Sequence, residues 1–173
     1  MSSVLRPRLR IFVSHSHTDT VFGPWLVQKL QGALNDDDTI FYDSEGGLRP
    51  GDNWFKVIRK KLETCNVFIV LLSKAAIRSK YVLNELDIIR VRHVKGRVRF
   101  IAILCEDFEP PADIINVYQV IKCFSPVDYQ TAFNEVLRGL DLPLDLGDLG
   151  VDPVQQAINR IEVAFTSGES IVI

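Results

Sequence analysis

Residues 67–72 form an unbroken apolar run, and this run constrains the fold more than any other segment. A strand that is apolar on both faces is typical of the centre of a parallel sheet covered by helices on each side. Shorter segments rich in β-branched and aromatic residues lie on either side of it in the sequence. Strands are therefore predicted at residues 9–14, 39–43, 67–72, 98–104 and 120–123.

Helical patterns alternate with these strands. Phe22, Trp25, Leu26 and Leu30, for example, recur at the spacing of one helix face. The predicted helices cover residues 21–34, 54–62, 82–93 and 129–140. The alternation predicts an α/β fold, a doubly wound, flavodoxin-like sheet of five parallel strands with helices on both faces. Such sheets bind ligands beyond the carboxyl ends of their strands.

The bulk composition indicates one ordinary globular domain. We expect residues 1–140 to form it, and residues 141–173 to be a linker with a C-terminal helical appendage or the start of a truncated region. The net charge of −2 predicts no general attraction to nucleic acid or to an anionic membrane. No apolar stretch reaches a membrane-spanning length, and the N-terminus lacks the pattern of a signal peptide, so a cytoplasmic location is expected. The odd number of cysteines, without CxxC spacing, favours free thiols.

One helix combines an aromatic ring with a carboxylate. Tyr81 and Glu85 are four residues apart, so they lie on the same helix face. A ring can stack on a base, and a carboxylate can hold a ribose or stabilise a sugar cation. Without further context, an exposed helix glutamate is usually only a solvated side chain.

Three segments, in order, give that context. Phe12-Val13-Ser14-His15 with Asp19 resembles the first conserved box of Toll/interleukin-1 receptor (TIR) domains. Residues 41–43 followed by 48–51 resemble the second box and its mobile loop, and residues 79–86 resemble the segment that carries the catalytic glutamate of NAD-cleaving, bacterial-type TIR domains. The resemblance covers roughly residues 8–140. The chain departs from the family in having Tyr81-Val82 where Trp-Cys is common, and in lacking the Phe-Trp pair of the third box, for which Phe133 is the nearest remnant.

The resemblance implies a TIR fold and an NAD⁺ glycohydrolase, which cleaves the nicotinamide–ribose bond to give nicotinamide and linear or cyclic ADP-ribose. It implies no metal and no cofactor, because NAD⁺ is the substrate. It also implies activation by self-association through the loop of residues 43–51, in immune or antiphage defence signalling. The implied catalytic residue is Glu85, and the implied substrate-binding residues are Tyr81, Ser14, His15, Asp43 and Ser79.

Other interpretations remain open at the level of sequence. A TIR domain can be a non-catalytic adaptor that acts through protein association. His15-Ser16-His17-Thr18-Asp19 also fits the first part of a dinuclear metallohydrolase motif, but only His93 remains as a further histidine.

The basic run at residues 90–99 is better explained by the end of a helix than by nucleic-acid binding, because basic side chains complement the helix dipole there. A receiver domain is excluded, since no aspartate ends the third strand.

Overall fold

Five parallel strands form the centre of the molecule, as the alternating pattern predicts. The structure is a computed structural model, and it describes residues 6–42, 53–115 and 119–146. The strands are β1 (Arg10–Ser14), β2 (Thr39–Tyr42), β3 (Val67–Leu72), β4 (Arg99–Leu104) and β5 (Val120–Lys122). Their order in the sheet is β2-β1-β3-β4-β5, and every pairing is parallel. The predicted doubly wound α/β fold is therefore confirmed.

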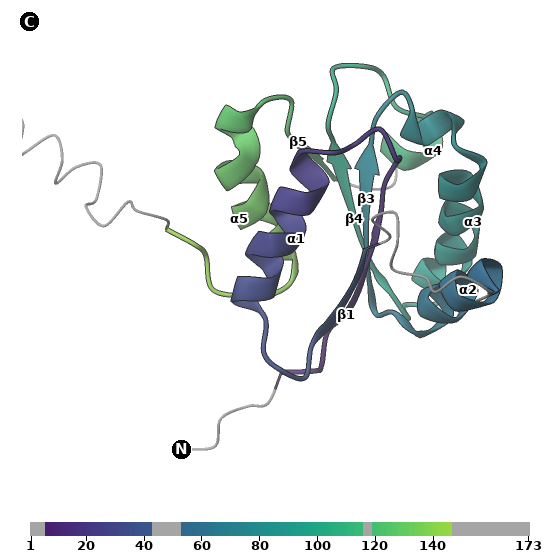
Figure 1. The fold of residues 1–173 in the computed structure, drawn as a ribbon, viewed down its shortest axis with the longest axis horizontal. Coiled ribbons are helices and arrows are strands. Elements are labelled where there is room, and N and C mark those ends of the chain that lie inside the picture. Colours follow the sequence, from purple (N-terminus) through teal and green to yellow (C-terminus); the bar gives the residue numbers. More distant parts are fainter. Residues whose placement is uncertain (1–5, 43–52, 116–118, 147–173) are drawn as a thin grey trace, which may run out of the picture.

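Helices cover both faces of the sheet (Figure 1). On one face lie α1 (Phe22–Ala33) and α5 (Tyr129–Gly139), and on the other lie α2 (Trp54–Thr64) and α3 (Lys80–Val94). Every residue of β3 is buried, which explains its unbroken apolar sequence. In β1, Ile11 and Val13 face α1 and α5, whereas Phe12 faces α2 and α3. This alternation decides which site each residue at the end of β1 can reach.

Short single-turn elements complete the fold. They are α4 (Ala112–Ile115) and two 3₁₀ turns, Ala76–Arg78 and Pro126–Asp128. The sequence analysis predicts no helix in these places, since one turn is too short to show a helical period. Among the residues that the structure describes, no helix is both long enough and apolar enough to cross a membrane.

The basic run ends α3, as predicted. Gly96 follows the helix with a φ of +66°, a left-handed conformation that glycine adopts without strain. Arg90 pairs with Asp113, and Arg92 donates to the carbonyl of Leu62. Arg99 bonds to Asp141 at 3.1 Å. These cations have internal structural partners, which agrees with a structural explanation of the run.

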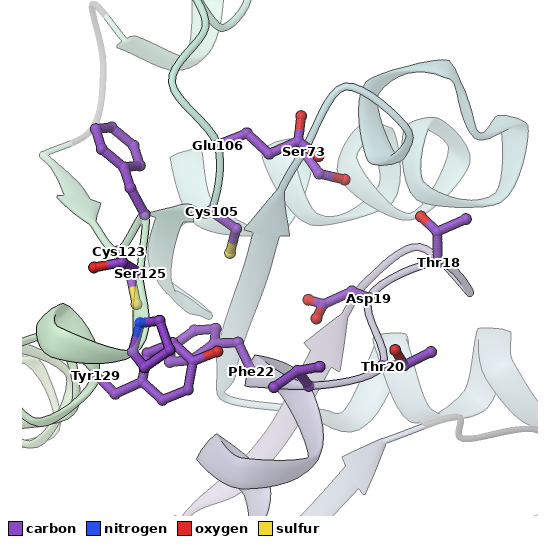
Figure 2. Close-up of a pocket in the computed structure, with 13 residues that line it drawn as sticks. Thr18, Asp19, Thr20, Phe22, Ser73, Cys105, Glu106, Cys123, Ser125 and Tyr129 are labelled. Carbon is purple, nitrogen blue, oxygen red and sulfur yellow. The ribbon is translucent and has the colours of Figure 1, made fainter.

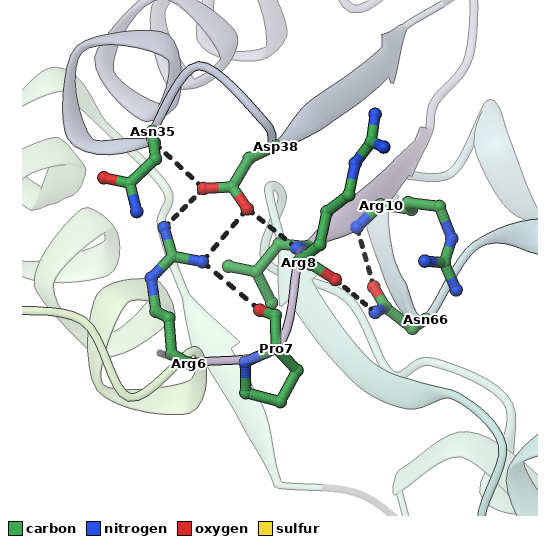
Figure 3. Close-up of polar contacts among 8 residues, drawn as sticks. Arg6, Pro7, Arg8, Arg10, Asn35, Asp38 and Asn66 are labelled. Atoms are coloured by element: carbon green, nitrogen blue, oxygen red, sulfur yellow. Dashed lines mark hydrogen bonds and ion pairs between the residues drawn. The ribbon is translucent and has the colours of Figure 1, made fainter. Parts of the chain in front are cut away.

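A polar cluster fixes the amino end of the sheet (Figure 3). The Asp38 carboxylate accepts hydrogen bonds from both outer nitrogens of Arg6 and, at 2.7 Å, from the backbone N–H of Leu9. It also accepts from the N–H of Asn35 at 2.9 Å, and the Arg6 guanidinium beside it holds the pKa of Asp38 well below its usual value. Asn66 ties β3 to β1 through Arg8 and Arg10. These bonds set the register at the end of the sheet opposite the carboxyl edge.

The chain continues to pack after α5. Leu140 and Leu142 are buried, and the Asp145 carboxylate bonds to Lys29 of α1 at 3.1 Å. Asn134 of α5 bonds to the backbone of Asp145 through both its oxygen and its nitrogen. Residues 141–146 therefore lie against α1 and α5, and the predicted appendage beyond them is outside the described residues.

Candidate active site

The structure joins Ser14, at the carboxyl end of β1, to Glu85 of α3. The Ser14 hydroxyl donates a hydrogen bond to Oε2 of Glu85. Ser14 is only 2% exposed, and Glu85 is half-buried. Val82, Leu86 and Ile89 anchor α3 against the sheet and so present Glu85 to the end of β1. Two residues that the sequence analysis selects from distant segments thus meet in one contact.

A small depression adjoins Glu85 between α2 and α3. Its volume is about 40 Å³. Tyr81 and Asn84 line it from α3, and Phe55 and Ile58 line it from α2. Tyr81 is 55% exposed, so part of its side chain faces solvent beside the carboxylate. The predicted pairing of ring and carboxylate on one helix face is present.

This arrangement suits the stabilisation of positive charge. A carboxylate that is held by a buried hydroxyl already has a fixed orientation. Little free energy is therefore spent on reorienting it when positive charge develops next to it. The apolar walls from Ile58, Leu62 and Ile88 lower the local dielectric, which strengthens the attraction. An exposed aromatic ring one turn away can stack on a flat heterocycle. Together these groups can hold a cationic ring next to an anionic oxygen.

Of the other predicted site residues, the structure gives His15 and Ser79 different contacts. His15 follows Ser14 and stacks on Tyr42, with ring centroids 4.1 Å apart and an angle of 24° between the planes. Tyr42 packs against the core cluster of α1 and α5, so His15 lies toward the opposite face of the sheet from Ser14. Ser79 is the N-cap of α3, where its hydroxyl accepts from the N–H of Val82 at 3.5 Å. Asp43 lies outside the described residues.

Sequence reasoning missed Phe55 and Asn84. Phe55 follows Trp54 at the start of α2 and is 58% exposed, off the buried stripe of the helix. A large apolar residue outside the core stripe of a helix can be recognised in the sequence as a candidate binding residue. Asn84 stands next to Glu85, and only the packing of α3 against α2 shows that it reaches the same depression.

The metallohydrolase interpretation finds no support in the described segments. The rings of His15 and His17 are 6.3 Å apart and meet edge to face. Among residues 6–42, 53–115 and 119–146, no three His, Cys, Asp or Glu side chains are grouped so that they can hold a metal ion. The described cysteines, Cys65, Cys105 and Cys123, are free thiols, as predicted.

Comparison with solved structures supports the fold. The TIR domain of the Toll-related receptor TRR-2 from Hydra magnipapillata is 17% identical with a TM-score of 0.59, over 77% of this chain and 98% of that one. The TIR domains of the activated Roq1 resistosome, which directly recognises the pathogen effector XopQ, are 20% identical with a TM-score of 0.50, over 76% of this chain and 72% of that one. A search of curated proteins gave no match.

The family follows from the sequence itself. The family profile described as "TIR domain" matches residues 11–137, a span that runs from β1 through most of α5 and includes both Ser14 and Glu85. The chain belongs to the TIR domain family.

Proposed function

We propose that this protein is an NAD⁺ glycohydrolase, which cleaves the bond between nicotinamide and ribose. We also propose that the enzyme is activated by self-association. The observation that supports the proposal is the half-buried Glu85 carboxylate, bonded to Ser14 and placed one helical turn from the exposed ring of Tyr81. Adaptor function by itself requires neither the carboxylate nor the ring.

The proposed reaction breaks the glycosidic C–N bond. Nicotinamide leaves with the bonding electron pair and becomes neutral, while the ribose acquires oxocarbenium character. The Glu85 carboxylate stabilises that positive charge and holds a ribose hydroxyl, as carboxylates do in glycoside hydrolysis. Water then adds to the ribose carbon and loses a proton, which gives ADP-ribose. Attack by a nucleophile of the ADP-ribose unit itself gives a cyclic product instead.

Tyr81 has a separate role in this proposal. Its exposed ring lies next to the carboxylate, where the cationic pyridinium of NAD⁺ can stack on it. Such a contact contributes roughly 1 kcal/mol or more when it is shielded from water. The depression of about 40 Å³ holds only part of a dinucleotide, so the rest of NAD⁺ extends along the carboxyl edge of the sheet.

The first test measures nicotinamide release from NAD⁺ over a series of protein concentrations. We expect release per molecule to rise steeply with protein concentration and to disappear in Glu85→Gln. The matched control is Glu135→Gln, which alters a glutamate of α5, on the other face of the sheet, whose partner is Arg138. Equal activity of wild type and Glu85→Gln would remove Glu85 from the mechanism.

A second candidate is a non-catalytic TIR adaptor. The observation that favours it is the apolar surface of α2 and α3, where Phe55, Tyr81 and Leu83 are all exposed. The TIR domains of the Roq1 resistosome, which share this fold, also belong to an assembly. If the protein self-associates in solution but releases no nicotinamide at any concentration, the adaptor is the better description.

A further inference from the structure

A second pocket, of about 220 Å³, lies on the face of the sheet that α1 and α5 cover (Figure 2). It gathers the segments that leave the carboxyl ends of β1, β3, β4 and β5, together with the first residue of α5. We call it the Asp19 pocket. It is lined by Thr18, Asp19, Thr20, Val21, Phe22, Ser73, Cys105, Glu106, Cys123, Phe124, Ser125, Pro126 and Tyr129.

Asp19 is the unusual group of this pocket. Its Oδ1 accepts a hydrogen bond from the N–H of Gly23 at 3.4 Å, in the first turn of α1. Its Oδ2 is buried and accepts no hydrogen bond within the described part of the chain. Burial is the main cause that raises the pKa of Asp19. The backbone N–H of Gly23, the nearby His15 and the N–H groups of Val21 and Phe22 lower it by less. Leaving a buried carboxylate oxygen without a donor is unfavourable, so a ligand that supplies a donor to Oδ2 is stabilised there.

The charge of the lining selects the ligand. The lining contains two carboxylates, Asp19 and Glu106, and no Lys, Arg or His. Burial raises the pKa of the Cys105 thiol, and it raises that of Cys123 to about 12, so both thiols stay neutral. A phosphate or carboxylate ligand would be repelled by the two carboxylates of the lining, whereas a cation is attracted. Phe22 and Tyr129, whose ring centroids are 4.9 Å apart, supply an aromatic wall for an apolar group.

From these observations we propose that the Asp19 pocket binds a small organic cation, a protonated amine that carries an apolar group. The ammonium group donates to the Asp19 carboxylate, and the apolar group lies against the aromatic wall. This pocket is separate from the Ser14–Glu85 site, because the two lie on opposite faces of the sheet. The proposal does not depend on the NAD⁺ reaction.

The test uses benzylammonium as the probe, with benzyl alcohol and benzoate as neutral and anionic controls of similar size. Amide signals of the isotope-labelled full chain are followed by NMR during each titration. We expect benzylammonium to shift the signals of residues 18–22 and 123–129 in a saturable way. At the same concentrations, benzyl alcohol and benzoate should leave them in place. Equal shifts with benzoate, or no shift with benzylammonium, would overturn the proposal.

Variants of the pocket locate the binding. Asp19→Asn should weaken benzylammonium binding at least about 10-fold, the equivalent of one charge-assisted hydrogen bond. Asp37→Asn, which alters an exposed carboxylate before β2, should leave it unchanged. Thr20→Trp, at the exposed rim, keeps the carboxylate and fills the pocket, so it tests the site even if Asp19→Asn fails to fold. Unchanged binding in Thr20→Trp would contradict the proposed location.

Discussion

At the scale of single residues, Ser14 links the sheet to the proposed catalytic group. Its hydroxyl is buried and donates to Glu85, so we treat it as a positioning residue. In Ser14→Ala we expect kcat for nicotinamide release to fall about 10- to 100-fold, the effect of losing one hydrogen bond to a charged group, with little change in KM. Ser14→Thr restores the hydroxyl and should recover most of kcat. If Thr fails to rescue while both variants fold, the hydroxyl does not position Glu85.

Tyr81 should affect substrate binding rather than folding. Its side chain is largely exposed, so Tyr81→Ala should change the free energy of unfolding by less than about 0.5 kcal/mol. Loss of stacking should raise KM for NAD⁺ by about 5- to 30-fold, while Tyr81→Trp keeps the ring and the affinity. The control is Val91→Ala, an exposed apolar residue of the same helix outside the depression. Steady-state kinetics of these three variants separate the two roles, and an unchanged KM in Tyr81→Ala would contradict stacking.

The residues at the end of β1 show what the sequence can and cannot predict about the site. Ser14 and His15 are adjacent in the chain, and the sequence analysis assigns both to one pocket. Successive side chains along an extended chain point to opposite faces of the sheet. Ser14 therefore lies toward Glu85, and His15 lies toward Tyr42. The pairing of Ser14 with Glu85 depends on how α3 packs on the sheet. No local pattern encodes that packing, so the sequence alone could not predict the contact.

At the scale of elements, α1 approaches β2 through Gly23. A Cβ atom on Gly23 would lie 2.5 Å from the hydroxyl oxygen of Tyr42, whereas one on Gly32 of the same helix would meet no atom within 4 Å. Helix propensity alone favours alanine at both positions by about 1 kcal/mol. We expect Gly32→Ala to stabilise the protein slightly and Gly23→Ala to destabilise it by about 1–3 kcal/mol. Denaturant unfolding of the two variants tests this, and equal stabilisation would contradict the close approach.

The elements themselves were largely predictable because their patterns are long. The β3 run and the amphipathic stripes of α1 and α5 extend over enough residues to fix both type and order. The start of α3 was less well predicted. The helix begins at Lys80, two residues before the predicted start, because Ser79 caps it and the polar first turn carries no apolar period.

At the scale of the whole molecule, the two ends of the sheet carry different kinds of polar group. The amino end is closed by the Arg6–Asp38 and Asn66 bonds, which join segments distant in sequence. The carboxyl end carries the Ser14–Glu85 site on one face and the Asp19 pocket on the other. The bonds that fix the strands thus lie at one end of the sheet, and both proposed ligand sites lie at the other. If the two proposals hold, stability and function are separated along the strand direction.

The Arg6–Asp38 pair at the amino end predicts how the free energy of unfolding depends on pH. The pKa of Asp38 is lowered in the folded protein, so the unfolded chain binds its proton at higher pH than the folded one. Its contribution is therefore complete above the unfolded pKa of about 4 and is lost as the pH falls further. The Asp38 side chain is 1% exposed, and Asp38→Ala should lower the free energy of unfolding near neutral pH by about 2 kcal/mol or more.

The same variant should also flatten the loss of stability in acid. We expect the free energy of unfolding of Asp38→Ala to fall less steeply than that of wild type as the pH decreases below about 4. Asp37→Ala, next to it in the chain and exposed, should follow the wild-type curve. Urea unfolding at several pH values measures all three proteins. Parallel curves for wild type and Asp38→Ala would show that the acid sensitivity arises elsewhere. Nicotinamide release per folded molecule should be unchanged in both variants, because the cluster lies at the end of the sheet away from Glu85.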